Sequence, residues 1–145
     1  MAYELRTEIA IDAPPDRVWS ILMDFPSYPD WNPFIRSIKG EARPRGKLKA
    51  RIQPSGGRAM TFKPTVLAAE PARELRWLGH LGFPGIFDGE HHLALVSLPE
   101  GGTRFRQEER FTGILVPLLR KSLDKDTRRG FEEMNLALKA RAENP

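Results

Sequence analysis

Apolar and polar residues alternate near the start of the chain. From residue 3 to residue 11 every second side chain is apolar, aromatic or threonine, and the residues between them are Glu, Arg or Ala. A period of two residues is typical of a strand with one buried face. Similar stretches, separated by turn residues, predict six more strands at 34–39, 46–53, 60–67, 74–78, 86–98 and 103–112. Pro64 fits its stretch only at a sheet edge or a bulge, because proline has no amide hydrogen to donate.

A helix opened by proline follows the first strand. Pro14 and Pro15 suit a first helical turn, where an amide hydrogen would have no partner within the helix. Val18, Trp19 and Leu22 then fall at helical spacing. Three prolines between residues 26 and 33 prevent the helix from continuing far beyond residue 25. We therefore expect two short helices and an aromatic-lined connection before the second strand.

The pattern changes to a helical one near the end of the chain. Between residues 114 and 142 apolar side chains recur every three or four positions, with charged residues between them. This spacing predicts one long amphipathic helix. Gly130 interrupts it at a cost of about 1 kcal/mol relative to alanine, and so marks a close approach or a bend.

Together these elements predict an α+β fold in which a curved, seven-stranded antiparallel sheet wraps around a long C-terminal helix. The 145 residues, 40% of them hydrophobic, suit a single domain over residues 1–145. Either side chains or a ligand must fill the space between the sheet and the helix.

Composition removes several classes of function. The chain has no cysteine, which excludes disulfides, cysteine-bound zinc, iron–sulfur clusters and thiol catalysis. The first residues lack the basic and apolar regions of a signal peptide, and no run approaches 18 apolar residues. We expect a cytoplasmic protein without an integral membrane segment.

The formal net charge is +4, and its basic residues occur in short clusters. Lys47, Lys49 and Arg51 alternate with Leu48, Ala50 and Ile52, which is the ordinary pattern of a strand with one wet face. We favour this interpretation over a phosphate-binding surface and expect no nucleic-acid partner.

Several motifs in the same order resemble the START-related superfamily, often labelled SRPBCC, which includes polyketide cyclase/dehydrase-like proteins. They are Val18-Trp19 in the proline-opened helix, Trp31-Asn32-Pro33, Gly101-Gly102-Thr103 before the last strand, and Glu109-x-Phe111-x-Gly113 ahead of the long helix. The resemblance covers nearly the whole chain. It implies a helix-grip fold with a deep apolar cavity for a small molecule or lipid. Members of the superfamily include lipid carriers, hormone receptors and aromatase/cyclases, so the fold alone names no single activity.

Strand parity and the resemblance together predict which side chains line that cavity. The expected lining is Trp31, Leu48, Ile52, Phe62, Trp77, Phe87, His91, Leu93, Leu95, Phe105, Gln107, Glu109, Phe111, Leu119, Leu123, Phe131 and Met134. Ligand cavities are mostly apolar with a few convergent polar groups. His91, Gln107 and Glu109 are the polar residues in the set, and they are the candidates for orienting a ligand.

His91 and Glu109 are also candidate catalytic residues. They lie on two strands joined by the turn at residues 99–102, so pairing about that turn could bring them onto one sheet face. A histidine beside a carboxylate suits general acid/base chemistry near neutral pH. The alternative is that both are hydrogen-bonded structural residues, and the sequence leaves both interpretations open.

No metal or cofactor is expected. His91 and His92 are adjacent in a predicted strand and so point to opposite faces, which makes a shared ion geometrically awkward. The glycine-rich segment 79–85 has neither P-loop nor dinucleotide-binding spacing.

Two segments form a candidate gate. Tyr28 and Trp31 lie in the proline-rich connection, and Gly82 and Phe83 lie in the glycine-rich loop. Aromatic residues beside glycine and proline are common in binding loops. Packing of these aromatics into the core is the competing interpretation.

Three functional hypotheses follow. The first is a carrier, sensor or sequestering protein for a hydrophobic or aromatic small molecule or lipid. The second is an enzyme of the cyclase/dehydrase type that uses a His/Glu pair in the same cavity. The third is a protein-interaction module that docks a partner on the basic face of residues 120–129.

Overall fold

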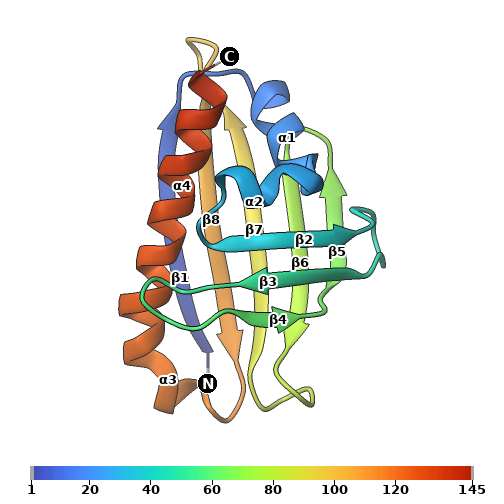
Figure 1. The fold of residues 1–145 in the computed structure, drawn as a ribbon, viewed down its shortest axis with the longest axis vertical. Coiled ribbons are helices and arrows are strands. Elements are labelled where there is room, and N and C mark those ends of the chain that lie inside the picture. Colours follow the sequence, from blue (N-terminus) through green and yellow to red (C-terminus); the bar gives the residue numbers. More distant parts are fainter. Residues whose placement is uncertain (1, 145) are drawn as a thin grey trace.

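The computed structural model describes residues 2–144, and its strands form two antiparallel sheets. The larger sheet has the order β1 (Ala2–Ile11), β8 (Thr103–Thr112), β7 (Asp88–Ser97), β6 (Glu74–His80) and β5 (Thr65–Glu70). The smaller sheet has the order β2 (Ile35–Gly40), β3 (Leu48–Ile52) and β4 (Met60–Phe62). Figure 1 shows the smaller sheet running across one face of the larger one.

The expected single sheet of seven strands is therefore wrong. Its error lies in the stretch 60–67, which forms two strands in different sheets. Phe62 pairs with Ala50 of the small sheet, whereas Val66 pairs with Trp77 of the large sheet. Pro64 lies between the two strands, where its missing amide hydrogen is not needed for a ladder, and its carbonyl accepts a hydrogen bond from the Leu48 amide.

The other predicted strands are confirmed within a few residues, and so are the helical regions. Helix α1 (Pro15–Met23) begins with Pro15 at its first position. A 3₁₀ turn, η1 (Phe25–Ser27), and the short helix α2 (Tyr28–Trp31) follow it. The long terminal helix is divided into α3 (Val116–Ser122), a π-helical turn η2 (Leu123–Thr127) and α4 (Arg128–Glu143).

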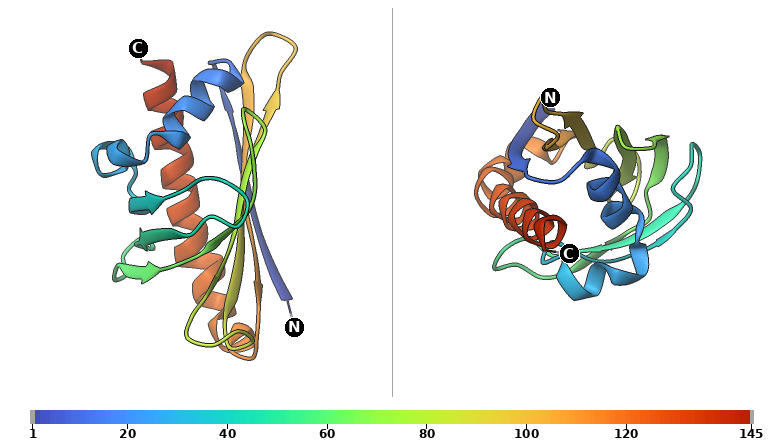
Figure 2. Two further views of the ribbon diagram at one scale, coloured as in Figure 1. Left: turned by 90° about the vertical axis from the view of Figure 1, so that its right-hand side faces the viewer. Right: turned by 90° about the horizontal axis from the view of Figure 1, so that it is seen from above.

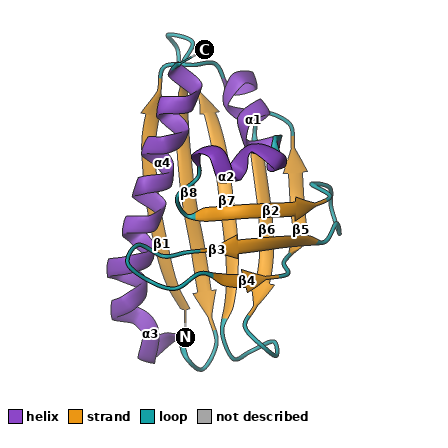
Figure 3. Cartoon of the chain, viewed as in Figure 1, coloured by secondary structure: helices purple, strands orange, loops and turns teal. Residues whose placement is uncertain are grey.

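Helix α4 packs along β1 on the same side of the large sheet as β2, β3 and β4 (Figures 1 and 2). Figure 3 shows the resulting order, with the large sheet behind and the helix and small sheet in front. Fully buried side chains between these layers include Leu5, Leu93, Phe105, Phe131 and Met134. This arrangement is the helix-grip fold.

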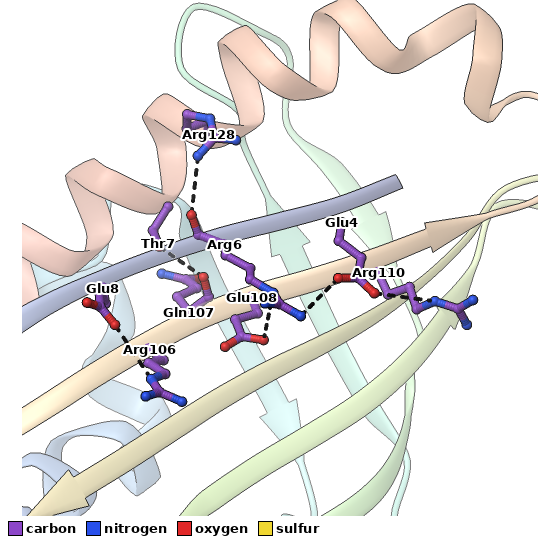
Figure 4. A network of polar contacts seen from close by, with 9 residues as sticks. All are labelled: Glu4, Arg6, Thr7, Glu8, Arg106, Gln107, Glu108, Arg110 and Arg128. Atoms are coloured by element: carbon purple, nitrogen blue, oxygen red, sulfur yellow. Dashed lines mark hydrogen bonds and ion pairs between the residues drawn. The ribbon is translucent and has the colours of Figure 1, made fainter. Parts of the chain in front are cut away.

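The opposite face of the large sheet is charged. Strands β1 and β8 place Glu4 opposite Arg110, Arg6 opposite Glu108 and Glu8 opposite Arg106. Ion pairs join these partners at 3.9, 3.8 and 3.5 Å respectively (Figure 4). Such exposed pairs contribute little stability. They identify this face as the wet one, so functional apolar side chains must lie on the inner face.

Candidate functional site

A cavity of about 210 Å³ lies between the two sheets at the end of the molecule where α3 begins. Apolar side chains form most of its wall. The lining residues are Phe34, Ile52, Pro54, Met60, Phe62, Pro64, Trp77, Gly79, Leu81, Phe87, Gly89, Glu109, Phe111, Leu119, Ser122, Leu123 and Thr127.

Strand alternation determines which residues of the large sheet reach the cavity. Trp77 and Gly79 lie two apart on β6, and Glu109 and Phe111 lie two apart on β8, so each pair shares the inner face. Gly89 occupies the equivalent face of β7 between them, opposite Phe111 in register. Glu109 is consequently the one carboxyl group among the lining residues.

The cavity volume limits the size of an occupant. A cavity of about 150 Å³ holds benzene, whereas sites for drug-sized ligands occupy about 300–1,000 Å³. At about 210 Å³ this cavity matches a compound of one or two rings. A complete two-chain lipid would require the walls to move apart.

The π-helical turn η2 closes one side of the cavity. Leu119 and Ser122 come from α3, and Leu123 and Thr127 come from η2. Such turns insert one extra residue into a helix and are frequent at functional sites. Helix α4, which starts at Arg128, contributes no lining residue. The cavity thus lies beside the first part of the predicted long helix rather than along its whole length.

The loop at residues 81–87 forms another wall and is tied down at both ends. The Leu81 amide donates to the Phe87 carbonyl at 2.9 Å, and the Phe87 ring stacks on Phe111 with centroids 5.5 Å apart. Ile114 and Leu115 donate to carbonyls of the loop. The loop is therefore joined to the start of α3.

Asp88 holds the tip of this loop. Its carboxylate lies 2.7 Å from His80 Nδ1 and accepts a hydrogen bond from the Gly85 amide at 3.0 Å. Desolvation acts to raise the pKa of Asp88, but the hydrogen bonds from His80 and Gly85 outweigh it and hold that pKa below its usual value. The ionised form of Asp88 thus stabilises the loop.

Glu109 and His91 face each other at the inner end of the cavity. The register of β7 and β8 places them directly opposite, and His91 Nδ1 lies 3.2 Å from Glu109 Oε1. Glu109 borders the cavity, whereas His91 is buried behind it, stacked on Trp77 with centroids 4.9 Å apart. Of these two residues, only Glu109 can therefore contact a ligand in the cavity directly.

A buried chain of hydrogen bonds extends from His91 to the first strand. His91 Nε2 lies 2.9 Å from Gln107 Oε1, and Gln107 Nε2 donates to Asn135 Oδ1 at 2.8 Å. Asn135 Nδ2 donates to Thr7 Oγ1 at 2.9 Å, and the Thr7 hydroxyl donates to the Gln107 carbonyl at 2.9 Å. Gln107 thus anchors the network and lies outside the cavity; its contact with Thr7 is drawn in Figure 4.

Residues 3–143 match the family model described as "Polyketide cyclase / dehydrase and lipid transport". The chain belongs to this family. No curated protein sequence matches the chain.

Several solved structures share the fold of this chain. The Zhui aromatase/cyclase from Streptomyces sp. R1128 superposes with a TM-score of 0.79 at 16% identity, over 99% of this chain and 94% of that one. A START superfamily protein from Mycobacterium smegmatis gives 0.74 at 21% identity, over 97% of each chain. The di-domain aromatase/cyclase BexL of the BE-7585A pathway gives 0.80 at 14% identity, over 99% of this chain. The chain spans about half of BexL, 51% of its length.

In this polyketide cyclase/dehydrase and lipid transport family member, the cavity brings together only part of the predicted lining. Eight predicted residues border it: Ile52, Phe62, Trp77, Phe87, Glu109, Phe111, Leu119 and Leu123. The others lie outside this wall, and most of them are buried in the core: Leu48, His91, Leu93, Leu95, Phe105, Gln107, Phe131 and Met134.

Nine lining residues were absent from the prediction. Met60 and Pro64 share the parity of Phe62, and Gly79 shares that of Trp77, so extending strand parity would have found them. Gly89, Ser122 and Thr127 likewise follow the face of residues already in the set. Pro54 and Leu81 lie outside strands and helices, where periodicity carries no signal. Phe34 lies just before β2, although the sequence predicted a strand from residue 34.

The predicted gate does not assemble around the cavity. Tyr28 is fully buried, and its hydroxyl donates to the Leu22 carbonyl at 2.8 Å. Burial raises the pKa of the Tyr28 phenol. Trp31 lines a separate surface groove between α1 and α4. Gly82 and Phe83 do lie in the loop that borders the cavity, and Phe83 is 76% exposed.

The described residues contain neither a membrane-spanning helix nor a cluster of metal ligands. No helix within residues 2–144 combines the length and the hydropathy that a membrane crossing requires. In the same part of the chain, no three histidine or acidic side chains gather closely enough to hold a metal ion.

Proposed function

We propose that this chain is a single ligand-binding domain that carries, senses or sequesters a small hydrophobic compound in the cavity between its two sheets. The observation that carries the proposal is the apolar cavity of about 210 Å³ with one carboxyl group in its wall. Apolar burial supplies affinity at roughly 25 cal/mol per Å² of surface removed from water. Glu109 orients the ligand by contacting its polar group.

The family membership supports this proposal without naming a ligand. The family description includes lipid transport, and this chain shares its fold with the aromatase/cyclases Zhui and BexL. The cavity volume favours one or two rings over a two-chain lipid.

A cavity-filling substitution tests the proposal. Leu119→Trp adds a large ring from α3 into the cavity, so we expect it to abolish binding of naphthalene-sized apolar probes measured by isothermal titration calorimetry. Leu118→Trp is the matched control, because Leu118 is the preceding residue and is 79% exposed. If Leu119→Trp binds the probes as tightly as the unaltered protein, the cavity is not the site.

An enzymatic role is the second candidate, favoured by the 3.2 Å contact between Glu109 and His91. In this role Glu109, which borders the cavity, moves a proton to or from the substrate. His91 acts through Glu109 as a positioning residue. Glu109→Gln would then remove turnover while leaving binding of the unreacted compound intact.

The interaction-module hypothesis has less support. Arg120 lies over the Tyr3 ring, with its guanidinium carbon 5.0 Å from the ring centroid. Arg128 forms hydrogen bonds with Asp124 and the Arg6 carbonyl. Both basic side chains are thus engaged within the chain, which leaves them less available to a partner.

A further inference from the structure

The buried hydrogen-bond chain has a direction that is set by two backbone carbonyls. A carbonyl oxygen can only accept, so the Thr7 hydroxyl must donate to the Gln107 carbonyl, and Thr7 Oγ1 must accept from Asn135. The Gln107 side-chain atom that lies 3.4 Å from the Phe131 carbonyl must likewise be its NH₂ group. These contacts fix the orientation of the Gln107 and Asn135 side-chain amides, because exchanging the oxygen and nitrogen of either amide would break them.

This direction determines the tautomer of His91. Gln107 presents its oxygen to His91, so His91 Nε2 must carry a hydrogen and donate it. The other ring nitrogen, Nδ1, is buried and faces Glu109 Oε1 at 3.2 Å without an aligned hydrogen-bond partner among the described residues.

The second carboxylate oxygen of Glu109 points elsewhere. It lies over Gly89, where a Cβ atom would approach Glu109 Oε2 to 2.2 Å. Gly89 itself lines the cavity, as does Glu109. In the carboxylate form of Glu109, Oε2 carries no hydrogen and can only accept a hydrogen bond.

We propose, resting on the function above, that the cavity selects neutral compounds of one or two rings that carry a hydroxyl group, and that this hydroxyl donates to Glu109 Oε2. The remaining wall around it is mainly apolar and suits the rings. A ligand that carries a carboxylate cannot donate to Oε2, and its negative charge is repelled by the carboxylate of Glu109. Selectivity thus comes from one acceptor-only atom in an apolar cavity.

A matched set of naphthalenes tests this selectivity by isothermal titration calorimetry at neutral pH. We expect 2-naphthol to bind about tenfold more tightly than 2-methoxynaphthalene, which has the same rings but no donor. We expect 2-naphthoate to bind more weakly than both. The ligand's hydroxyl could be phenolic or alicyclic, and decahydro-2-naphthol distinguishes the two. Tighter binding of 2-naphthol identifies a phenol, and tighter binding of the saturated compound identifies an alicyclic alcohol.

Two substitutions at Glu109 distinguish hydrogen bonding from charge. Glu109→Gln can donate its NH₂ group to His91 Nδ1 and leave its oxygen facing the cavity, so the preference for 2-naphthol should persist. Glu109→Leu keeps an apolar wall but has no acceptor, so 2-naphthol and 2-methoxynaphthalene should bind within about twofold of each other.

The outcomes separate this inference from the proposed function. Equal binding of 2-naphthol and 2-methoxynaphthalene to the unaltered protein would overturn the donor preference but leave ligand binding intact. A loss of the preference in Glu109→Gln would also overturn it, because recognition would then depend on charge. Failure of every naphthalene to bind would overturn the proposed function itself.

Discussion

Two glycines allow large side chains to border the cavity. A Cβ atom at Gly130 would lie 2.5 Å from Phe34 Cδ1, closer than real Cβ contacts come, and one at Gly89 would collide with Glu109 Oε2. The Phe34 ring packs edge-on against Phe131 with centroids 5.2 Å apart, so it has little room to retreat. The positions of Glu109 and Phe34 in the cavity wall therefore depend on the absence of a Cβ atom at Gly89 and Gly130.

Gly130→Ala should therefore destabilise the protein although alanine favours a helix. Helix propensity gains about 1 kcal/mol, and overpacking costs about 1–3 kcal/mol, so we expect a net loss of about 1 kcal/mol in the free energy of unfolding measured by urea denaturation. In a Phe34→Leu background the ring is absent and the same change should cost less. An equal cost in both backgrounds would mean that Phe34 is not the obstacle.

At the scale of elements, the loop 81–87 and the turn η2 form two walls of the cavity. The loop is held by Asp88, whose carboxylate accepts from Gly85, and by its bonds to the residues that precede α3. The turn η2 places Leu123 and Thr127 in the wall. A regular α-helix through the same segment would turn the residues after the extra one to a different direction.

The lowered pKa of Asp88 makes the loop sensitive to acid. A carboxyl group with a lowered pKa contributes stability above its ordinary value of about 3.9, and this contribution is lost as pH falls through the lowered value. We expect the Gly85 amide resonance to titrate with a midpoint below about 3.9 in nuclear magnetic resonance spectra.

Asp88→Ala should remove that titration because the acceptor is gone. Asp16→Asn, an exposed change on α1, should leave it unaltered. A midpoint at or above the ordinary value would show that the hydrogen bonds from His80 and Gly85 do not favour the ionised form.

At the scale of the whole molecule, the buried polar chain joins the layers. Thr7 belongs to β1, Gln107 to β8 and Asn135 to α4, so their hydrogen bonds fasten the helix to the sheet. The same chain ends at His91 and Glu109 beside the cavity. Helix docking and the acceptor character of the site therefore depend on one network.

Asn135→Ala should lower the free energy of unfolding by about 1–3 kcal/mol, because it leaves buried polar groups of Gln107 and Thr7 without partners. Equilibrium denaturation in urea measures this change. Leu136→Ala is the control, since Leu136 is the next residue on α4 and is 61% exposed, and it should change stability by less than about 0.5 kcal/mol. Similar losses in both variants would mean that the polar chain contributes no particular stability.

Local periodicity was sufficient to predict much of the fold. The alternation at residues 3–11 and 103–112 corresponds to β1 and β8, and the pairing of the strands around residues 99–102 brings His91 opposite Glu109. Gly130 marks the close approach to Phe34 that its place in the helix suggested. The strand periodicities and the hairpin pairing depend on neighbours in the chain, so the sequence carries them directly.

The sequence by itself determined which residues form strands and helices and which face of each is apolar, because both follow from side-chain spacing along the backbone. Only the tertiary structure decided that β4 and β5 belong to different sheets, since the parity of residues 60–66 is the same on both sides of Pro64. It also decided where apolar faces leave space. Buried core and cavity wall have the same local pattern, and they differ only in whether another element packs against them: α4 fills the region around Phe105 and Phe131, and the region between the sheets near η2 remains open.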